Sequence, residues 1–206
     1  MGQTLTLALA LAVVGYLLGG IPTAYVLGRR FHGVDIRTMG SRNVGTVNAY
    51  KLLGWRLGAV VLAVDTGKGA AAMLLAMAAG LADWELFFVA MAVTAGNNWS
   101  PYLRLAGGKG LAVVFGISLA VVPLLSVLAL PAVVLAFVVT RGLVWAFTAG
   151  IAVVNALVIV SGQPVDVVVT CVVLSTIVIV THFARSLPEI KTAIVERNLR
   201  LFGRVE

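Results

Sequence analysis

Long apolar runs, separated by short polar segments, follow one another along most of the chain. They cover residues 5–27, 57–81, 84–94, 111–140, 142–160 and 165–180. Since a helix needs about 20 mostly apolar residues to cross a bilayer, this pattern predicts an all-α, polytopic integral membrane protein. Composition agrees, because 61% of the 206 residues are hydrophobic and 11% are charged, against about 25% charged in soluble domains. A disordered chain and an ordinary soluble globule are therefore excluded.

The run Leu111–Thr140 allows two interpretations. It is too long for one simple span and too short for two full ones, and Pro123 and Pro131 interrupt it. Read as one span, it places Arg141 and the basic C-terminal tail outside. Split near Pro123, it gives the chain seven membrane helices with a short fourth one.

Charge decides between these interpretations. With the split, every Lys and Arg except Lys68 lies on one side of the membrane, and the other side carries Asp83, Glu85 and Asp166. Basic loops of membrane proteins face the cytoplasm, so we predict seven helices in one membrane domain, 1–206, with the N-terminus outside and the C-terminus cytoplasmic. The net charge of +7 then follows from topology and anionic lipid, and no nucleic-acid partner is expected.

The first polar loop, about residues 28–56, is unusually rich in small and hydrogen-bonding side chains. At a glycine the backbone can approach a ligand closely. The amide of Asn and the hydroxyl of Ser add neutral hydrogen-bond donors, and Arg or Lys adds positive charge. The loop therefore suits a phosphate, and an ordinary polar loop turned by Gly and Asn is the equal alternative. The candidate residues are Gly40, Ser41, Arg42, Asn43, Gly45, Asn48 and Lys51.

The second polar loop, residues 96–110, ends in Gly107-Gly108-Lys109-Gly110 directly before the short fourth helix. Glycines before a helix let backbone N–H groups face an anion, and the helix dipole adds to the attraction. We expect the Gly107 and Gly108 amides to hold a phosphate together with the Lys109 ammonium group. The spacing differs from that of a nucleotide-hydrolysing phosphate loop, so no nucleotide is implied.

The basic tail, residues 182–206, begins where the last span ends. A solvated helix on anionic lipid accounts for most of its charges. His182 is placed to titrate or to donate to phosphate, and Arg185, Asn198 and Arg200 are further candidates for phosphate binding.

Asp65 and Lys68 are ionisable residues inside the second span. Being three apart on a helix, they face each other. A mutual ion pair that joins two helices is the favoured interpretation, and a functional role is the alternative.

At these residues the chain resembles the bacterial membrane glycerol-3-phosphate acyltransferases that use acyl phosphate as donor. The family's first motif, G-S-G-N-x-G-A-T-N, matches residues 40–48 at five positions, and its G-G-K-G matches residues 107–110. Asp65, Lys68-Gly69, Pro164 and His182 also fit the family pattern.

The resemblance implies transfer of a fatty acyl group from acyl phosphate to the 1-hydroxyl of glycerol 3-phosphate, without metal or other cofactor. It also implies a bacterial inner membrane location and an active site at the cytoplasmic face. Ser41, Lys51, Lys109 and His182 become the candidate catalytic residues. The remaining candidates would bind substrate or phosphate.

Four further departures from the family pattern lie outside the first motif. Lys51 replaces Arg, Asn97 replaces a His, Arg185 replaces Asn, and Pro188 replaces Arg. These changes leave room for a different acceptor or for an inactive relative that binds phosphate-bearing lipid. A small transporter using Asp65 and Lys68 is a third alternative, although the sequence contains no internal repeat to support it.

An acyl phosphate is already activated, so we expect direct transfer, in which the protein supplies position and charge stabilisation. Ser41 as a covalent nucleophile is the alternative, but no His-Asp partner is apparent for it.

Overall fold

The computed structural model describes the backbone of residues 2–202 and the side chains of residues 4–82 and 84–185. Within that part of the chain the regular structure is entirely helical, as predicted. The helices are α1 (Gly2–Gly20), α2 (Thr23–His32), α3 (Thr46–Ala78), α4 (Asp83–Asn98), α5 (Leu111–Val121), α6 (Pro123–Leu128), α7 (Leu130–Thr140), α8 (Leu143–Val160) and α9 (Val165–Phe202), with the 3₁₀ turns η1 (Ile36–Thr38) and η2 (Pro101–Leu103).

Five helical segments among the described residues are long and apolar enough to cross a membrane. They are Thr4–His32, Thr46–Ala78, Pro123–Thr140, Leu143–Val160 and Val165–Arg185. The two remaining segments, α4 with 16 residues and α5 with 11, are shorter. At 1.5 Å per residue α5 is only about 16 Å long. The apolar run after Gly110 therefore splits at Pro123, as predicted, and its first part is the short helix.

The first apolar run is not one continuous helix, which corrects the predicted span over residues 5–27. Helix α1 ends at Gly20 and α2 begins at Thr23. Pro22 has no N–H to donate, so the helical hydrogen-bond ladder cannot continue through it. The carbonyl of Gly20 instead accepts a 2.6 Å bond from Ser100 Oγ, and that of Ile21 accepts from Lys68 Nζ. Polar side chains within the bundle thus hydrogen-bond the backbone carbonyls at the break.

The boundaries of two polar segments also differ from those predicted. The second half of the 28–56 loop belongs to α3, which begins at Thr46 and has one non-helical residue, Gly54, with φ +84° and ψ 170°. The tail after residue 182 continues α9 without a break, and α9 ends at Phe202. Helical structure therefore extends well beyond the apolar runs.

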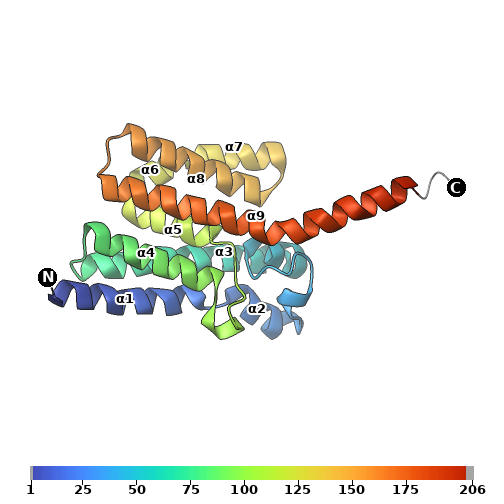
Figure 1. Ribbon diagram of the computed structural model, residues 1–206, viewed down its shortest axis with the longest axis horizontal. Coiled ribbons are helices and arrows are strands. Elements are labelled where there is room, and N and C mark those ends of the chain that lie inside the picture. The colour runs from blue at the N-terminus through green and yellow to red at the C-terminus, as the bar shows by residue number, and fades with distance from the viewer. Residues whose placement is uncertain (1, 203–206) are drawn as a thin grey trace.

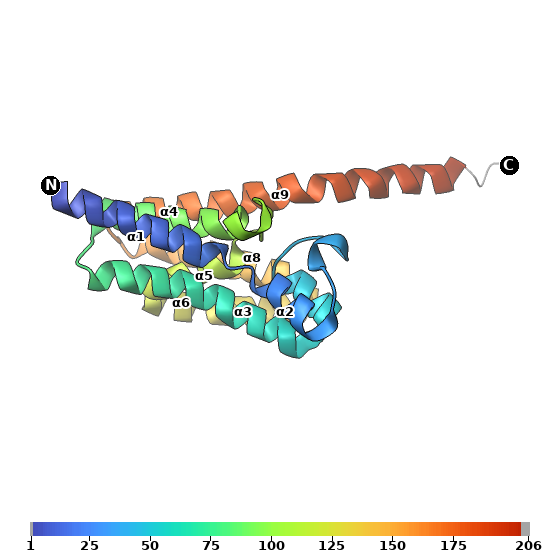
Figure 2. The ribbon, with the colours of Figure 1, turned by 90° about the horizontal axis from the view of Figure 1, so that it is seen from below.

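The helices run roughly parallel or antiparallel in one bundle, and the chain termini lie at opposite ends of it (Figure 1 and Figure 2). Helices α3, α5 and α8 begin at the end nearer the C-terminus, and α4 ends there. The polar loops 33–45 and 99–110 consequently gather at that end (Figure 1). An odd number of crossings, as the split of the fourth run predicts, gives this arrangement.

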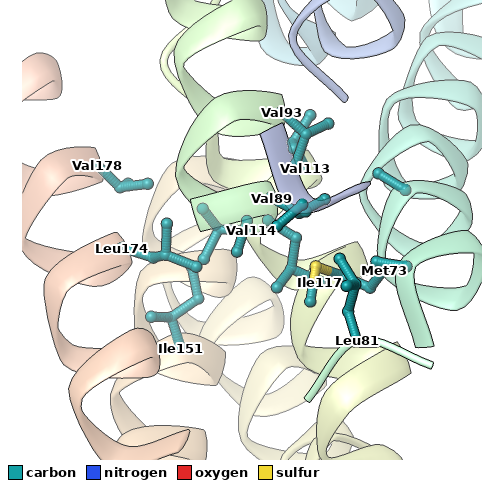
Figure 3. Packing of buried hydrophobic residues seen from close by; sticks show 14 residues of the cluster. Met73, Leu81, Val89, Val93, Val113, Val114, Ile117, Ile151, Leu174 and Val178 are labelled. Atoms are coloured by element: carbon teal, nitrogen blue, oxygen red, sulfur yellow. The ribbon is translucent and has the colours of Figure 1, made fainter. Parts of the chain in front are cut away.

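Small residues bring the closest helix pairs together. A Cβ added to Gly19 of α1 would lie 2.1 Å from the carbonyl oxygen of Val93, and one added to Gly96 of α4 would lie 2.0 Å from that of Tyr16. Helices inside a membrane gain little from the hydrophobic effect, so close backbone packing of this kind drives their association. Apolar side chains from several helices fill the space between the pairs, among them Met73, Val93, Ile117, Ile151 and Leu174 (Figure 3).

Candidate active site

Asn48 holds the first polar loop in shape from inside α3. Its side-chain nitrogen donates to the carbonyl oxygens of Ile36, Met39 and Asn43 at 3.0–3.2 Å. Its oxygen accepts from the Ser41 backbone N–H at 3.1 Å, and the residue is 1% exposed. The amide expected to bind phosphate is therefore engaged by the loop backbone, and it acts as a brace.

Gly40 is part of the same arrangement. Its φ of +56° lies in the left-handed region, and an added Cβ would lie 2.4 Å from Asn48 Oδ1. Any side chain here would displace the brace, so the glycine is needed for close packing. Arg42, with φ +56°, is exposed at the outer turn of the loop.

An acidic residue fastens the loop to α2. Asp35 Oδ2 lies 2.7 Å from Arg37 Nη2 and 3.2 Å from Arg29 Nη2. The Arg37 side chain lowers the pKa of the Asp35 carboxyl to about 2, mainly by hydrogen bonding, and Arg29 contributes by its charge. Asp35 therefore stays ionised at physiological pH and ties α2 to η1.

The Gly-Gly-Lys-Gly loop is held from both sides. The Gly108 N–H donates to the carbonyl oxygen of Asn97 at 2.8 Å, so this amide, expected to face an anion, is occupied within the protein. A Cβ on Gly107 would lie 2.3 Å from the Asn97 carbonyl oxygen. From α9, the Arg185 guanidinium donates to the carbonyls of Asn98, Gly107 and Gly108. Arg185, also predicted to bind phosphate, binds backbone carbonyls here.

One cavity of about 230 Å³ lies where the two loops meet the start of α8 and the end of the membrane part of α9. All four predicted catalytic residues line it: Ser41, Lys51, Lys109 and His182. Of the predicted binding residues, Asn43, Gly45, Gly108 and Gly110 line it and Gly40, Arg42, Asn48, Gly107 and Arg185 do not. Asn198 and Arg200 lie outside the residues whose side chains are described.

The cavity has a polar side and an apolar side. Asn43 Oδ1 and Thr46 Oγ1 on its wall are buried without a hydrogen-bond partner among the described residues. Buried polar atoms are costly unless paired, so these two are suited to a ligand. The cavity is also lined by apolar residues, which form its apolar wall: Val47, Leu111, Ala112, Val113, Leu143, Val144 and Phe147.

The apolar wall was not predicted from the sequence, because Leu143, Val144 and Phe147 look like any other residues of a span. The available signal was topological. In the seven-helix arrangement the helix after Arg141 begins at the same end as the polar loops, so its first residues lie beside them.

Asp65 and Lys68 form the expected ion pair with each other on α3, and Thr23 of α2 bonds to both side chains. Lys68 Nζ lies 2.6 Å from Asp65 Oδ1 and 2.7 Å from Thr23 Oγ1, which in turn donates to Asp65 at 2.9 Å. A second cavity, of about 10 Å³, has Asp65 and Asn97 in its wall, and both residues also line the first cavity. The pair therefore lies next to the site.

Comparison with known proteins identifies relatives of the chain. A family model described as glycerol-3-phosphate acyltransferase matches residues 9–188. A glycerol-3-phosphate acyltransferase of Thermus thermophilus is 38% identical over 179 residues, which cover 86% of this chain and 89% of the relative. Glycerol-3-phosphate acyltransferase 5 of Dehalococcoides mccartyi is 45% identical over 120 residues, and that match spans about half of its length, 52%.

A solved structure with the same architecture is that of PlsY, an integral membrane glycerol 3-phosphate acyltransferase, in its glycerol 3-phosphate form. It superposes with a TM-score of 0.81 at 29% identity, over 92% of this chain and 93% of that one. The lysophosphatidic acid form of that protein superposes with a TM-score of 0.78.

Proposed function

Because the chain belongs to the glycerol-3-phosphate acyltransferase family, we propose that it transfers a fatty acyl group from acyl phosphate to the 1-hydroxyl of glycerol 3-phosphate. The hydroxyl oxygen attacks the acyl carbonyl carbon, and the bond from that carbon to the phosphate oxygen breaks. Lysophosphatidic acid and inorganic phosphate leave, and the phosphate takes the hydroxyl proton. The observation that carries this proposal is a single cavity that joins two basic, glycine-rich loops to an apolar wall.

The two substrates fit the two sides of the cavity. Each carries a phosphate, and Lys51 and Lys109 supply positive charge from different segments. The donor also carries an acyl chain, which the side chains of Leu143, Val144 and Phe147 accommodate. Asn43 and Thr46 supply the neutral polar groups that fix orientation.

Catalysis in this site rests on positioning and on stabilisation of the developing charge. No hydrogen bond joins Ser41 Oγ to a histidine or carboxylate among the described side chains, and the proposal therefore does not use Ser41 as a nucleophile. In this proposal a substrate phosphate accepts the proton of the acceptor hydroxyl. Asn48 contributes by fixing the loop that carries Ser41 and Asn43.

The site faces the cytoplasm of a bacterial inner membrane in this proposal. Segments 28–56, 96–110 and 182–206 together carry 13 of the 15 Lys and Arg residues, and basic segments are retained on the cytoplasmic side. A reporter that is active only in the cytoplasm should then be active when fused to the C-terminus and inactive when fused to the N-terminus. A C-terminal reporter outside the cell contradicts this orientation.

The deciding experiment uses purified protein in detergent with palmitoyl phosphate and glycerol 3-phosphate. Phosphate release and lysophosphatidic acid are both measured. We expect equal amounts of the two products. Lys109→Ala should lower turnover at least about tenfold, because a donor that stabilises the developing charge is lost. Arg56→Ala is the matched control, because Arg56 is an exposed cation against Trp55, away from the cavity. Wild-type turnover in Lys109→Ala contradicts the role of that lysine.

The alternatives separate in the same assay. A protein that binds both substrates and forms no ester is the inactive relative, and other phosphate-bearing acceptors would then be compared. Solute or proton flux in liposomes without ester formation would identify a transporter. A trapped acyl ester on Ser41 contradicts direct transfer.

A further inference from the structure

We infer that Arg185 is a positioning residue, which fixes the Gly-Gly-Lys-Gly loop so that Lys109 points into the cavity. Its guanidinium lies on α9, 77 residues from Gly108 in sequence. Nη1 donates to the carbonyl oxygen of Gly107 at 2.6 Å and to that of Gly108, and Nη2 donates to that of Asn98. One side chain thereby joins α9, the loop and the end of α4.

These contacts set the guanidinium apart from a phosphate ligand. Both terminal nitrogens of the guanidinium already donate to backbone carbonyls, so fewer of its five N–H groups remain to bind an anion. Arg185 is also absent from the cavity wall, whereas Lys109 is part of it. The planar fork of arginine suits several acceptors at once, and lysine offers only a point charge.

The bonds also orient the peptide that precedes Lys109. The peptides of the described residues are trans, so each N–H points away from the carbonyl of the same peptide. With the Gly108 carbonyl turned to Arg185, the Lys109 N–H points to the opposite side. The Gly108 N–H is held by Asn97 on α4. The loop is therefore fixed between α4 and α9, and the start of the Lys109 side chain is fixed with it.

The kinetic test of this role rests on the proposed function. We expect Arg185→Ala and Arg185→Lys to lower kcat roughly 10- to 100-fold, because a displacement of about 1 Å at a catalytic group has effects of that size. KM for palmitoyl phosphate and for glycerol 3-phosphate should stay within about threefold of wild type. In a Lys109→Ala background, Arg185→Ala should add little, since the two residues act through one another. Arg56→Ala is the control for loss of a cation.

A second readout is independent of activity. In a Cys171→Ser protein, a spin label at Ala106→Cys reports the mobility of the loop, because Ala106 is exposed beside Gly107. We expect Arg185→Ala and Arg185→Lys to mobilise this label and Arg56→Ala to leave it unchanged. If the wild-type protein forms no ester, the label alone tests the role.

Two results would overturn the inference. One is an unchanged label mobility in both Arg185 variants. The other is a rise in KM for one phosphate substrate with kcat unchanged, which would make Arg185 a ligand of that phosphate. Arg185→Lys keeps the charge, so it decides the matter if Arg185→Ala does not fold.

Discussion

Lys68 Nζ lies 2.6 Å from Asp65 Oδ1 on the same face of α3, and the pair also bonds to residues at the junction of α1 and α2. The two side chains are 4% and 7% exposed. Lys68 donates to the carbonyl of Ile21, where the first helix is broken, and Thr23 donates to Asp65. At a helix end in solution, water hydrogen-bonds the free backbone groups, and within the bundle this pair takes that role.

Removing one partner of this pair should be strongly destabilising. Lys68→Met leaves the Asp65 carboxylate without a counter-charge and removes one donor from the Ile21 carbonyl, which keeps the Thr23 N–H at 3.0 Å. We expect a loss of about 3–5 kcal/mol in the free energy of unfolding. Thermal unfolding in detergent measures it, with Arg56→Met as the exposed control. A Lys68→Met protein as stable as wild type would show that the pair has no structural role.

Contact between α3 and α5 should depend on two glycines and be insensitive to a third. An added Cβ on Gly69 would lie 2.1 Å from the Val113 carbonyl oxygen, and one on Gly116 1.9 Å from that of Thr66. Alanine at either position forces the helices apart, at an expected cost of about 1–3 kcal/mol.

Gly67→Ala is the matched control on the same helix, because nothing lies within 4 Å of its added Cβ. There the better helix propensity of alanine should stabilise by up to about 1 kcal/mol. Equal effects at Gly67 and Gly69, measured by thermal unfolding, would contradict this packing.

Lys51 should contribute charge to phosphate binding. Lys51→Met is expected to lower kcat/KM for one of the two substrates about 10- to 100-fold, the size of one lost charge-assisted hydrogen bond. Lys51→Arg keeps the charge and should retain most of the activity. Steady-state kinetics with each substrate varied in turn distinguishes the phosphates. Equal kinetics in Lys51→Met and Arg56→Met would remove Lys51 from the site.

The apolar wall should govern the acyl donor alone. Val144→Trp fills part of the cavity and is expected to raise KM for palmitoyl phosphate at least about tenfold. KM for glycerol 3-phosphate should change little. Val138→Trp is the control, because Val138 is 62% exposed on the outside of α7. A selective effect on glycerol 3-phosphate would place the acyl chain elsewhere.

Stability should respond to acid through Asp35. Its pKa is lowered from 3.8 to about 2, so the carboxyl binds protons more weakly in the folded protein than in the unfolded one. Its contribution is therefore complete above pH 3.8 and is lost as the pH falls toward 2. We expect the stability difference between wild type and Asp35→Asn to be constant at neutral pH and to shrink below pH 4. Chemical unfolding at a series of pH values measures it, and a difference that persists unchanged at pH 2 would contradict the assignment.

Much of the fold follows from the apolar pattern and from charge. The split at Pro123 was predictable because only that reading gathers the basic residues on one side. The break at Pro22 was not predicted, since apolar residues flank it and its carbonyls are satisfied by Ser100 and Lys68, which are distant in sequence.

The site divides in the same way. Lys109 was predicted because three glycines surround it directly before a helix, and His182 because it lies where the last span ends; the structure places both on the cavity wall. Asn48 and Arg185 carry the same kinds of hydrogen-bond donor as a residue that binds phosphate. Only their distances to backbone carbonyls show that they hold the loops in shape. Side-chain type alone does not distinguish a ligand from a brace.

The broken end of α1 also has a consequence for the order of assembly. The groups that complete it arrive late in synthesis, because Lys68 lies in the second span and Ser100 follows the third. Before those groups arrive, the Gly20 carbonyl lacks its Ser100 donor and the Ile21 carbonyl has the Thr23 N–H alone, so a first helix by itself in the bilayer keeps this end near the headgroups and water. It reaches its final depth only when the chain up to Ser100 has been inserted.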